Sequence, residues 1–348
     1  MNERAAFSSL EYPFKAPPGN GETIEVADGV HWIRMPLPFA LSHINLWAVW
    51  DGGGWALVDS GIRSNDTANA WQRLFGGPLK SGPATRVFVT HMHPDHVGMA
   101  GWLTRHFDCR LWMSRQEYLA CRSLVADTLR EAPADGVRFY RRAGWGEDQL
   151  EGYRARFGEF GKHVYTPPDS YRRLQDGELL DVDGREWRVV MGNGHSPEHA
   201  CFYCRDLGVL ISGDQVLPRI SSNVSVYPTE PDADPLGDWL DSIKKLKREV
   251  PEDVLVLPAH NECFHGLHQR LDDLARSHCE GLDRLRGLLT EPRRAIDVFD
   301  VLFARPIDGS QLLTLATGES VAHLNYLLRR GEATVDYDAN DVAWYRLA

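Results

Sequence analysis

The sequence predicts an α/β protein in which two β-sheets pack face to face and helices cover their outer sides. Two observations lead to this fold class: strand-like segments gather in two groups, within residues 23–113 and 187–258, and helical segments flank each group. The composition agrees, because 43% hydrophobic and 25% charged residues are ordinary for a globular protein and exclude disordered and fibrous classes. At 348 residues the chain is long enough for one large core and a smaller additional unit.

The first group of segments predicts an antiparallel meander followed by alternating strands and helices. Its strands are short runs rich in apolar and β-branched residues, and turns such as the glycine-rich residues 51–54 separate the first three. Helices are expected around Trp71 and Leu74 and over residues 97–106. We expect the strands at residues 23–35, 43–50, 55–59, 87–89 and 110–113.

The second group predicts another sheet with two long amphipathic helices beside it, over residues 238–249 and 267–289. Its strands are expected at residues 187–191, 201–204, 209–212 and 254–258. Between the two groups lies a helical insertion, about residues 114–180, in which Tyr153, Phe157 and Phe160 recur at the spacing of one helix face. This aromatic stripe predicts either core packing or a lid over a binding site.

A break at Glu291-Pro292 divides the chain into a main domain, residues 1–290, and a C-terminal domain, residues 291–348. The C-terminal domain is expected to be a small α+β unit, with three short helices and two strands around residues 338–341. We expect those helices over residues 295–303, 309–315 and 319–330.

The charge and cysteine content restrict the function classes. A net charge of −11 opposes binding to nucleic acid or to an anionic membrane surface. The six cysteines are scattered along a long chain, which indicates reduced thiols and a cytoplasmic protein rather than a disulfide framework. We find no apolar run of the length of a membrane span or a signal peptide, so no membrane partner is expected.

The strongest local signal is the segment Thr90-His91-Met92-His93-Pro94-Asp95-His96, which follows the expected strand at residues 87–89. Four of its side chains, those of His91, His93, Asp95 and His96, are imidazoles or carboxylates, the ligand types that zinc, iron and manganese accept. A strand-to-helix turn lets such side chains converge on one point. The segment therefore predicts a metal site.

Three more residues of these types each follow the end of an expected strand: His195, Asp214 and His260. Sites in α/β layers form at the carboxyl ends of strands, so these residues are expected to join the first four. His265 and His268 are alternative candidates for the place of His260.

The segments THMHPDHVG, GHSPEH, SGD and PAH resemble the motifs of the metallo-β-lactamase fold superfamily, over about residues 23–290. The resemblance implies a four-layer αββα sandwich with a dinuclear metal site in the cleft between the sheets. It implies that His91, His93 and His195 hold the first metal and that Asp95, His96 and His260 hold the second. Asp214 would bridge the two.

The resemblance also implies roles for two further residues. Asp59, in LVDSG, would orient metal ligands without binding metal itself, and His199 is expected to act in the same way or to be structural. The two bound ions would be divalent, with zinc the first choice and iron or manganese the alternatives. The bridging position holds Asp214 and not cysteine, which disfavours a zinc β-lactamase. Position 93 holds His and not Glu, which disfavours a flavodiiron protein.

The activity implied is that of a metal-dependent hydrolase with a ligand set like that of glyoxalase II. In it a metal-bridging hydroxide attacks the acyl carbon of a thioester, lactone or related ester, and Asp95 and Asp214 serve catalysis with that hydroxide. One alternative is a phosphodiesterase or endoribonuclease. A further alternative is a sulfur dioxygenase with a single iron.

The C-terminal domain resembles the winged-helix extension of some superfamily members, which include endoribonucleases. It carries six basic and eight acidic residues over 292–348, so nucleic acid is not expected as a partner, and packing or homo-oligomer formation is expected instead. The expected partner is a small-molecule acyl substrate. Candidate contacts to it are Asn223 and Tyr227, in the loop after Asp214, and Phe157 in the insertion.

Overall fold

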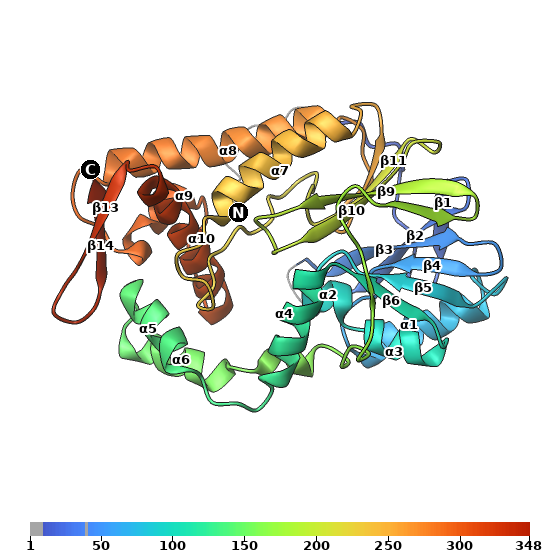
Figure 1. Cartoon of the computed structure of the whole chain (residues 1–348), viewed down its shortest axis with the longest axis horizontal. Helices are drawn as coiled ribbons and strands as arrows, with labels where there is room; N and C mark the ends of the chain where they lie inside the picture. Colours follow the sequence, from blue (N-terminus) through green and yellow to red (C-terminus); the bar gives the residue numbers. More distant parts are fainter. Residues whose placement is uncertain (1–9, 39–40) are drawn as a thin grey trace.

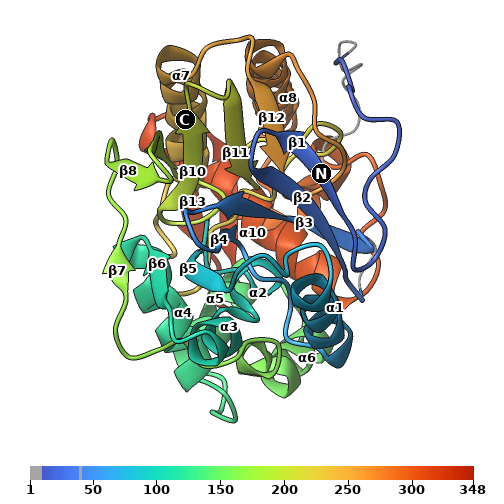
Figure 2. The same cartoon turned by 90° about the vertical axis from the view of Figure 1, so that its right-hand side faces the viewer.

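The computed structural model describes residues 10–38 and 41–348. Two β-sheets stack face to face between two layers of helices, which confirms the predicted four-layer α/β arrangement (Figures 1 and 2). The sandwich forms one end of an elongated molecule, and the C-terminal hairpin lies at the other end (Figure 1).

The first sheet has seven strands in the order β1-β2-β3-β4-β5-β6-β7. The pairs from β1 to β4 are antiparallel, as the predicted meander requires, and those from β4 to β7 are parallel. The strands are β1 (Thr23–Ala27), β2 (Val30–Pro36), β3 (His43–Trp50), β4 (Trp55–Val58), β5 (Ala84–Phe88), β6 (Arg110–Met113) and β7 (Arg172–Arg173).

The second sheet has the order β12-β11-β10-β9-β8, in which only β11 and β12 pair in parallel. Its edge strand β8 was not predicted, and neither was β7 of the first sheet, because both are short and lie at the end of the expected helical insertion. The strands are β8 (Leu179–Val182), β9 (Arg185–Gly192), β10 (His199–Cys204), β11 (Val209–Gly213) and β12 (Leu255–Pro258).

Helices cover the outer face of each sheet. Against the first sheet pack α1 (Asn65–Gly76), α3 (Ala100–His106) and α4 (Arg115–Ala126), which share one apolar cluster with it. Against the second sheet pack α7 (Pro235–Glu249) and α8 (Leu267–Leu288). The predicted helix at residues 97–106 is instead two helices, α2 (Pro94–Val97) and α3, with Gly98 and Met99 between them.

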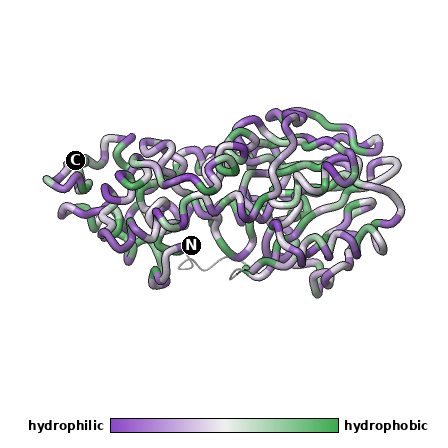
Figure 3. Tube along the Cα trace, turned by 90° about the horizontal axis from the view of Figure 1, so that it is seen from below, coloured by the Kyte–Doolittle hydropathy of each residue, from purple (hydrophilic) through white to green (hydrophobic). Residues whose placement is uncertain are grey.

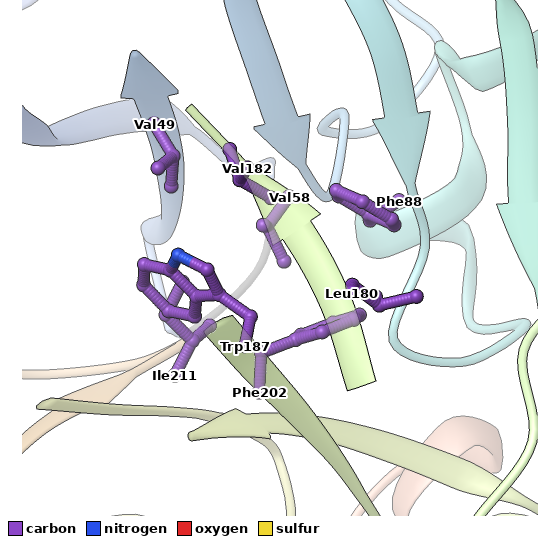
Figure 4. A pocket seen from close by; sticks show the side chains of 8 residues that line it. All are labelled: Val49, Val58, Phe88, Leu180, Val182, Trp187, Phe202 and Ile211. Carbon is purple, nitrogen blue, oxygen red and sulfur yellow. The ribbon is translucent and has the colours of Figure 1, made fainter. Parts of the chain in front are cut away.

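The space between the two sheets is filled by a third apolar cluster, which includes Trp32, Trp47 and Trp187. A small apolar cavity remains inside it (Figure 4). No titratable side chain lines this cavity, so it belongs to the packing of the sandwich and offers no chemistry. Its walls are Val49, Val58, Phe88, Leu180, Val182, Trp187, Phe202 and Ile211.

The insertion packs against the C-terminal segment. Side chains of α5 (Ala134–Arg142) and α6 (Glu147–Arg156) share one apolar cluster with α7, α8 and the C-terminal residues. The Trp145 indole N–H donates to the Thr317 hydroxyl over 2.9 Å, and Arg142 pairs with Asp341 at 2.9 Å. The C-terminal segment is therefore joined to the rest of the chain through a continuous core.

The C-terminal segment contains one long helix where two were predicted. Residues 309–315 and 319–330 belong to α10 (Ser310–Arg329), which passes through Gly318 without a break. Gly318 is needed for close packing, because a Cβ atom there would lie 2.7 Å from the Ser225 hydroxyl. Around α10 lie η2 (Ala295–Val298), α9 (Phe299–Leu302) and the hairpin β13 (Ala333–Tyr337) and β14 (Ala343–Leu347). The resemblance of this unit to a winged helix stays a prediction.

The aromatic stripe of the insertion does not lie on one helix face, contrary to the expectation. Helix α6 ends at Arg156, and Gly158 adopts a left-handed φ of 80° before the short helix η1 (Glu159–Lys162). Tyr153 consequently packs with α5 and the C-terminal core, whereas Phe160 packs with the first sheet's outer cluster. Phe157 lies half-buried between them, in edge contact with the Tyr153 ring.

Along the described residues, no helix combines the length and the apolar character that crossing a membrane requires. Figure 3 shows hydrophilic and hydrophobic residues alternating over short distances along the chain. All six cysteines are free, and Cys201 and Cys204 are both buried in β10.

Two glycines in helices provide a test of this packing. Gly101→Ala in α3 would place a Cβ atom 2.2 Å from the Thr166 carbonyl oxygen, and we expect a loss of about 1–3 kcal/mol in the free energy of unfolding. Gly152→Ala in α6 meets no atom within 4 Å and should stabilise by about 0.5–1 kcal/mol, because alanine is the better helix former. Urea unfolding measures both. Equal stabilisation by the two substitutions would contradict the close approach of α3 to residues 165–166.

Candidate metal centre

The residues predicted to bind metal lie at one edge of the sandwich, just beyond the carboxyl ends of four strands. His91 and His93 follow β5, His195 follows β9, Asp214 follows β11 and His260 follows β12. Asp95 and His96 occupy the first turn of α2, where Pro94 starts the helix. Strand ends from both sheets thus carry the site, which is why residues so distant in sequence meet.

The structure brings all seven predicted residues together in two groups. The first contains His91, His93, His195 and Asp214, and the second contains Asp95, His96 and His260. Within each group the potential ligand atoms lie within 4.8 Å of one another. The alternative candidates lie elsewhere, because His265 and His268 each bond a backbone carbonyl, of Val254 and Val250 respectively.

Asp214 lies between the two groups. Its Oδ2 atom is 3.4 Å from His195 Nε2 in the first group. Its Oδ1 atom is 3.5 Å from both His96 Nε2 and His260 Nε2 in the second group. One carboxylate oxygen therefore faces each group, which is the arrangement that a bridging ligand needs.

The donor atoms fit a metal ion. Ligands at about 2.0–2.1 Å in a tetrahedron lie about 3.3 Å from each other, close to the separations seen here. His195 Nε2 and His91 Nε2 are 3.3 Å apart, and His260 Nε2 and Asp95 Oδ2 are 3.4 Å apart. His96 Nε2 and Asp214 Oδ1 are buried and have no hydrogen-bond partner among the described residues. Buried polar atoms without partners are costly, and a cation between them would satisfy both.

Two of the rings that face the centre are oriented by a hydrogen bond on their other side. The Nδ1 atom of His195 lies 2.8 Å from the Asn223 carbonyl oxygen, and that of His260 lies 3.0 Å from the His43 carbonyl oxygen. These acceptors place the proton on Nδ1 and leave Nε2 free to bind a metal.

Asp59 performs the same function for His96. Its Oδ2 atom lies 2.8 Å from His96 Nδ1, and its Oδ1 atom accepts the backbone N–H of Thr90 at 2.8 Å. Asp59 is buried and does not belong to either group of potential ligands. Its φ of 63° is in the left-handed region, so the surrounding bonds hold a backbone conformation that aspartate seldom adopts.

His199 binds the backbone beneath Asp214. Its Nε2 atom accepts the Asp214 N–H at 3.0 Å, and burial holds the pKa of His199 well below its usual value, so the ring is neutral. Gly213 is required at this point, because a Cβ atom there would lie 2.5 Å from His199 Nε2. His199 thus contacts the site through the backbone N–H of Asp214.

The electrostatics of the site favour a positive charge. Burial, then the adjacent His195, lowers the pKa of His93 to about 3, so this imidazole is neutral. Burial opposes the charge on Asp95, yet His96 and His260 outweigh it and lower the pKa of Asp95 to about 2. His96 is buried as well, but the carboxylates of Asp59, Asp214 and Asp95 raise its pKa well above the usual value. These carboxylates require a cation beside them, which a proton or a metal ion can supply.

Of the candidate substrate contacts, Asn223 lies next to this centre, because its carbonyl oxygen faces His195. Asn223 directs its side-chain amide to α10, donating to Glu319 Oε2 at 2.7 Å. Tyr227 is 38% exposed, and partial burial, reinforced by Glu117, raises its pKa to about 12, so its hydroxyl stays protonated at neutral pH. Phe157 lies in the insertion, beside Tyr153. Contact between substrate and these three residues stays a prediction.

Sequence reasoning missed two glutamates that contact the ligand loops. Glu117 in α4 is fully buried and accepts backbone N–H groups from two loops, and burial raises its pKa. Glu319 in α10 holds Asn223, whose carbonyl holds His195. Neither lies in a motif. The only signal in the sequence is a carboxylate on the side of a helix that is otherwise buried.

Comparisons with known proteins agree with this geometry. The metallo-beta-lactamase superfamily profile matches residues 41–260, and a profile for the metallo-beta-lactamase-like C-terminal domain matches residues 282–348. A crystal structure of a beta-lactamase domain protein from Burkholderia ambifaria superposes with a TM-score of 0.89 at 39% identity, covering 97% of this chain and 98% of that chain.

Several curated relatives are described as thioesterases. An atrochrysone carboxyl ACP thioesterase from Aspergillus fumigatus is 24% identical over 260 residues, which are 74% of this chain and 47% of the relative. An acyl-coenzyme A thioesterase from Gallus gallus is 26% identical over 259 residues, which are 73% of this chain and 84% of the relative. The chain spans about half the length of the fungal relative. Since the superfamily profile covers more than half of the sequence, the chain belongs to the metallo-beta-lactamase superfamily.

Proposed function

We propose that this chain is a metal-dependent hydrolase of acyl compounds, with a thioester, lactone or related ester as substrate. The observation that carries the proposal is the position of Asp214, whose two carboxylate oxygens face two separate groups of potential metal ligands. A site for two ions with one carboxylate between them suits hydrolysis.

In this proposal two divalent ions are bound, zinc being the first choice. His91, His93 and His195 would hold the first ion, Asp95, His96 and His260 the second, and Asp214 would bridge them. Imidazole and carboxylate also suit iron and manganese. When bound, such ions lower the pKa of water and polarise a substrate oxygen.

The chain's own residues would keep this site charged and ordered. Asp95 and Asp214 are ionised at neutral pH, because the facing imidazoles lower both pKa values against the effect of burial. Carboxylates of such low pKa are weak bases, so we assign them to charge compensation and geometry more than to proton transfer. In thioester hydrolysis water adds to the acyl carbon, the C–S bond breaks, and the protons end on the thiol and the solvent.

Three observations support an acyl substrate. Two relatives are described as thioesterases acting on acyl groups carried by a protein and by coenzyme A. The chain's net charge of −11 opposes binding of a polyanion such as RNA. The protonated hydroxyl of the partly exposed Tyr227 would donate a hydrogen bond to a substrate oxygen, and Asn223 and Phe157 would line the same approach.

We further propose that residues 291–348 form a small domain that supports the site in addition to any role in homo-oligomer formation. Helix α10 contacts the loop after Asp214 through the Val226 N–H, which donates to the Gly318 carbonyl at 3.0 Å, and through Glu319 on Asn223. The six free cysteines support a reducing compartment such as the cytoplasm.

Metal content tests the dinuclear assignment. Protein supplied with zinc should carry close to two ions per chain by elemental analysis, and Asp214→Ala should reduce this number and abolish hydrolysis, since it removes the carboxylate shared by both groups. Asp241→Ala removes an exposed carboxylate of α7 and should change neither quantity. If the wild-type protein never holds more than one tightly bound ion of zinc, iron or manganese, the dinuclear assignment is wrong.

A substrate panel tests the reaction class. We expect kcat/KM to be highest for a thioester or a lactone, and far lower for bis(p-nitrophenyl) phosphate and a short RNA, because the acidic chain disfavours polyanions. Asp214→Ala run in parallel shows whether the turnover belongs to this site. Faster cleavage of either phosphodiester than of every acyl compound would overturn the acyl proposal in favour of a nuclease.

Tyr227→Phe tests the proposed hydrogen bond to substrate. Loss of one neutral hydrogen bond worth about 0.5–1.5 kcal/mol should reduce kcat/KM about 2- to 10-fold, with metal content unchanged. Tyr337→Phe, on the exposed hairpin strand β13, is the matched control and should have no effect. Equal kinetics for the two variants would show that the Tyr227 hydroxyl does not contact the reacting group.

A further inference from the structure

Glu117 connects the two loops that carry the first group of ligands. Its Oε2 atom accepts the backbone N–H of Met92 at 2.9 Å, and Met92 lies between His91 and His93. Its Oε1 atom accepts the backbone N–H of Glu198 at 2.7 Å, three residues after His195. One buried side chain thus binds a loop from each sheet of the sandwich.

Glu198 returns the contact. Its Oε2 atom accepts the backbone N–H of Gln116 at 2.8 Å, in the first turn of α4. The backbone N–H groups in the first turn of a helix have no partner within the helix. The side chain of Ser114, which precedes α4, does not accept any of them. The Glu198 carboxylate therefore caps α4 from another loop, at the positive end of the helix dipole.

We infer that Glu117 and Glu198 form a reciprocal clamp that sets the distance between His195 and the pair His91 and His93. The inference rests on the proposed function, because it concerns residues assigned to the first metal. Glu117 itself belongs to neither group of potential ligands, so it is a positioning residue. It acts through backbone atoms that lie next to the ligands.

The geometry gives the clamp a specific signature. Both oxygens of Glu117 accept N–H groups, so Glu117→Gln would set an amide NH₂ against a backbone N–H and break one of the two contacts. Only one oxygen of Glu198 accepts an N–H from α4, so Glu198→Gln keeps an acceptor for Gln116, whereas Glu198→Ala does not. The same amide substitution should therefore be damaging at position 117 and tolerated at position 198.

Zinc affinity, measured by competition with a chromophoric chelator on the full chain, tests the clamp. Residues that orient metal ligands typically contribute about 10- to 100-fold to affinity, and we expect a loss of that size for Glu117→Gln. Glu198→Ala should lose several-fold, and Glu198→Gln should stay within about twofold of the wild type. Thermal unfolding is followed for every variant.

A destabilised control separates positioning from a general loss of stability. Leu180→Ala removes a buried side chain between the sheets, in the wall of the cavity shown in Figure 4, and leaves the ligand loops untouched. At an equal drop in unfolding temperature, it should keep its zinc affinity whereas Glu117→Gln should not. Equal losses of affinity in these two variants would assign Glu117 a merely structural role and overturn the inference.

The remaining outcomes are also decisive. If Glu117→Gln binds zinc like the wild type, the clamp does not position the ligands. If Glu117→Gln fails to fold, the two Glu198 variants decide, and identical zinc affinities for Glu198→Ala and Glu198→Gln contradict the clamp. If the wild-type protein binds no metal, the proposed function is wrong, and the clamp, which rests on it, is wrong as well. The titration of the wild-type protein alone shows this outcome.

Discussion

Asp214 is a buried carboxylate whose two oxygens face two different groups of imidazole nitrogens. A buried carboxylate costs free energy unless a positive charge lies beside it. Asp95 and Asp59 are carboxylates of the same site, so they also require positive charge. The raised pKa values of His96 and His260 follow from this requirement. Most contacts around the site serve this arrangement, since they fix the ring orientation or the loop from which a ligand projects.

The ligand loops are held from three directions. The strands of the sandwich place the loops at one edge, beyond the ends of β5, β9, β11 and β12. Helix α4 holds two of the loops through Glu117. Helix α10 holds the loop after Asp214 through Asn223 and Gly318. The insertion and the C-terminal segment thus support the site, and both share an apolar core with the second sheet.

The same architecture separates packing from chemistry. The cavity between the sheets is lined only by apolar side chains, whereas the potential metal ligands gather at the sheet edge, where backbone turns free the side chains from the alternation of a strand. Gly213 shows how close this edge is packed, because any side chain there would strike His199. Substitutions in the sandwich core should therefore act on stability, and those in the loops on metal binding.

The local pattern of the sequence was sufficient for the fold class, most strands and the seven residues of the candidate metal centre. Apolar runs that end in His or Asp identify strand ends, and sites in α/β layers form at such ends, so His91 and His260 could be expected at one site without coordinates. The assignment of the ligands to two separate metals came from the resemblance to the superfamily. Helix boundaries were less predictable where a glycine was involved. Gly318 lies inside α10 and allows close packing there, whereas Gly158 adopts a positive φ just after α6 and interrupts the helical stripe that begins with Tyr153.

Only the tertiary structure decided the roles of Glu117, Glu319 and Asn223. Each makes its contact with a residue far away in the sequence. Glu117 accepts the Met92 backbone N–H, Glu319 accepts the side-chain amide of Asn223, and the backbone carbonyl of Asn223 faces the His195 ring. Backbone N–H and C=O groups are the same at every residue, so no residue pattern records which of them a distant side chain will bind. Metal ligands can be recognised in the sequence because their chemistry lies in the side chain, whereas the contacts that position them depend on how the chain folds back on itself.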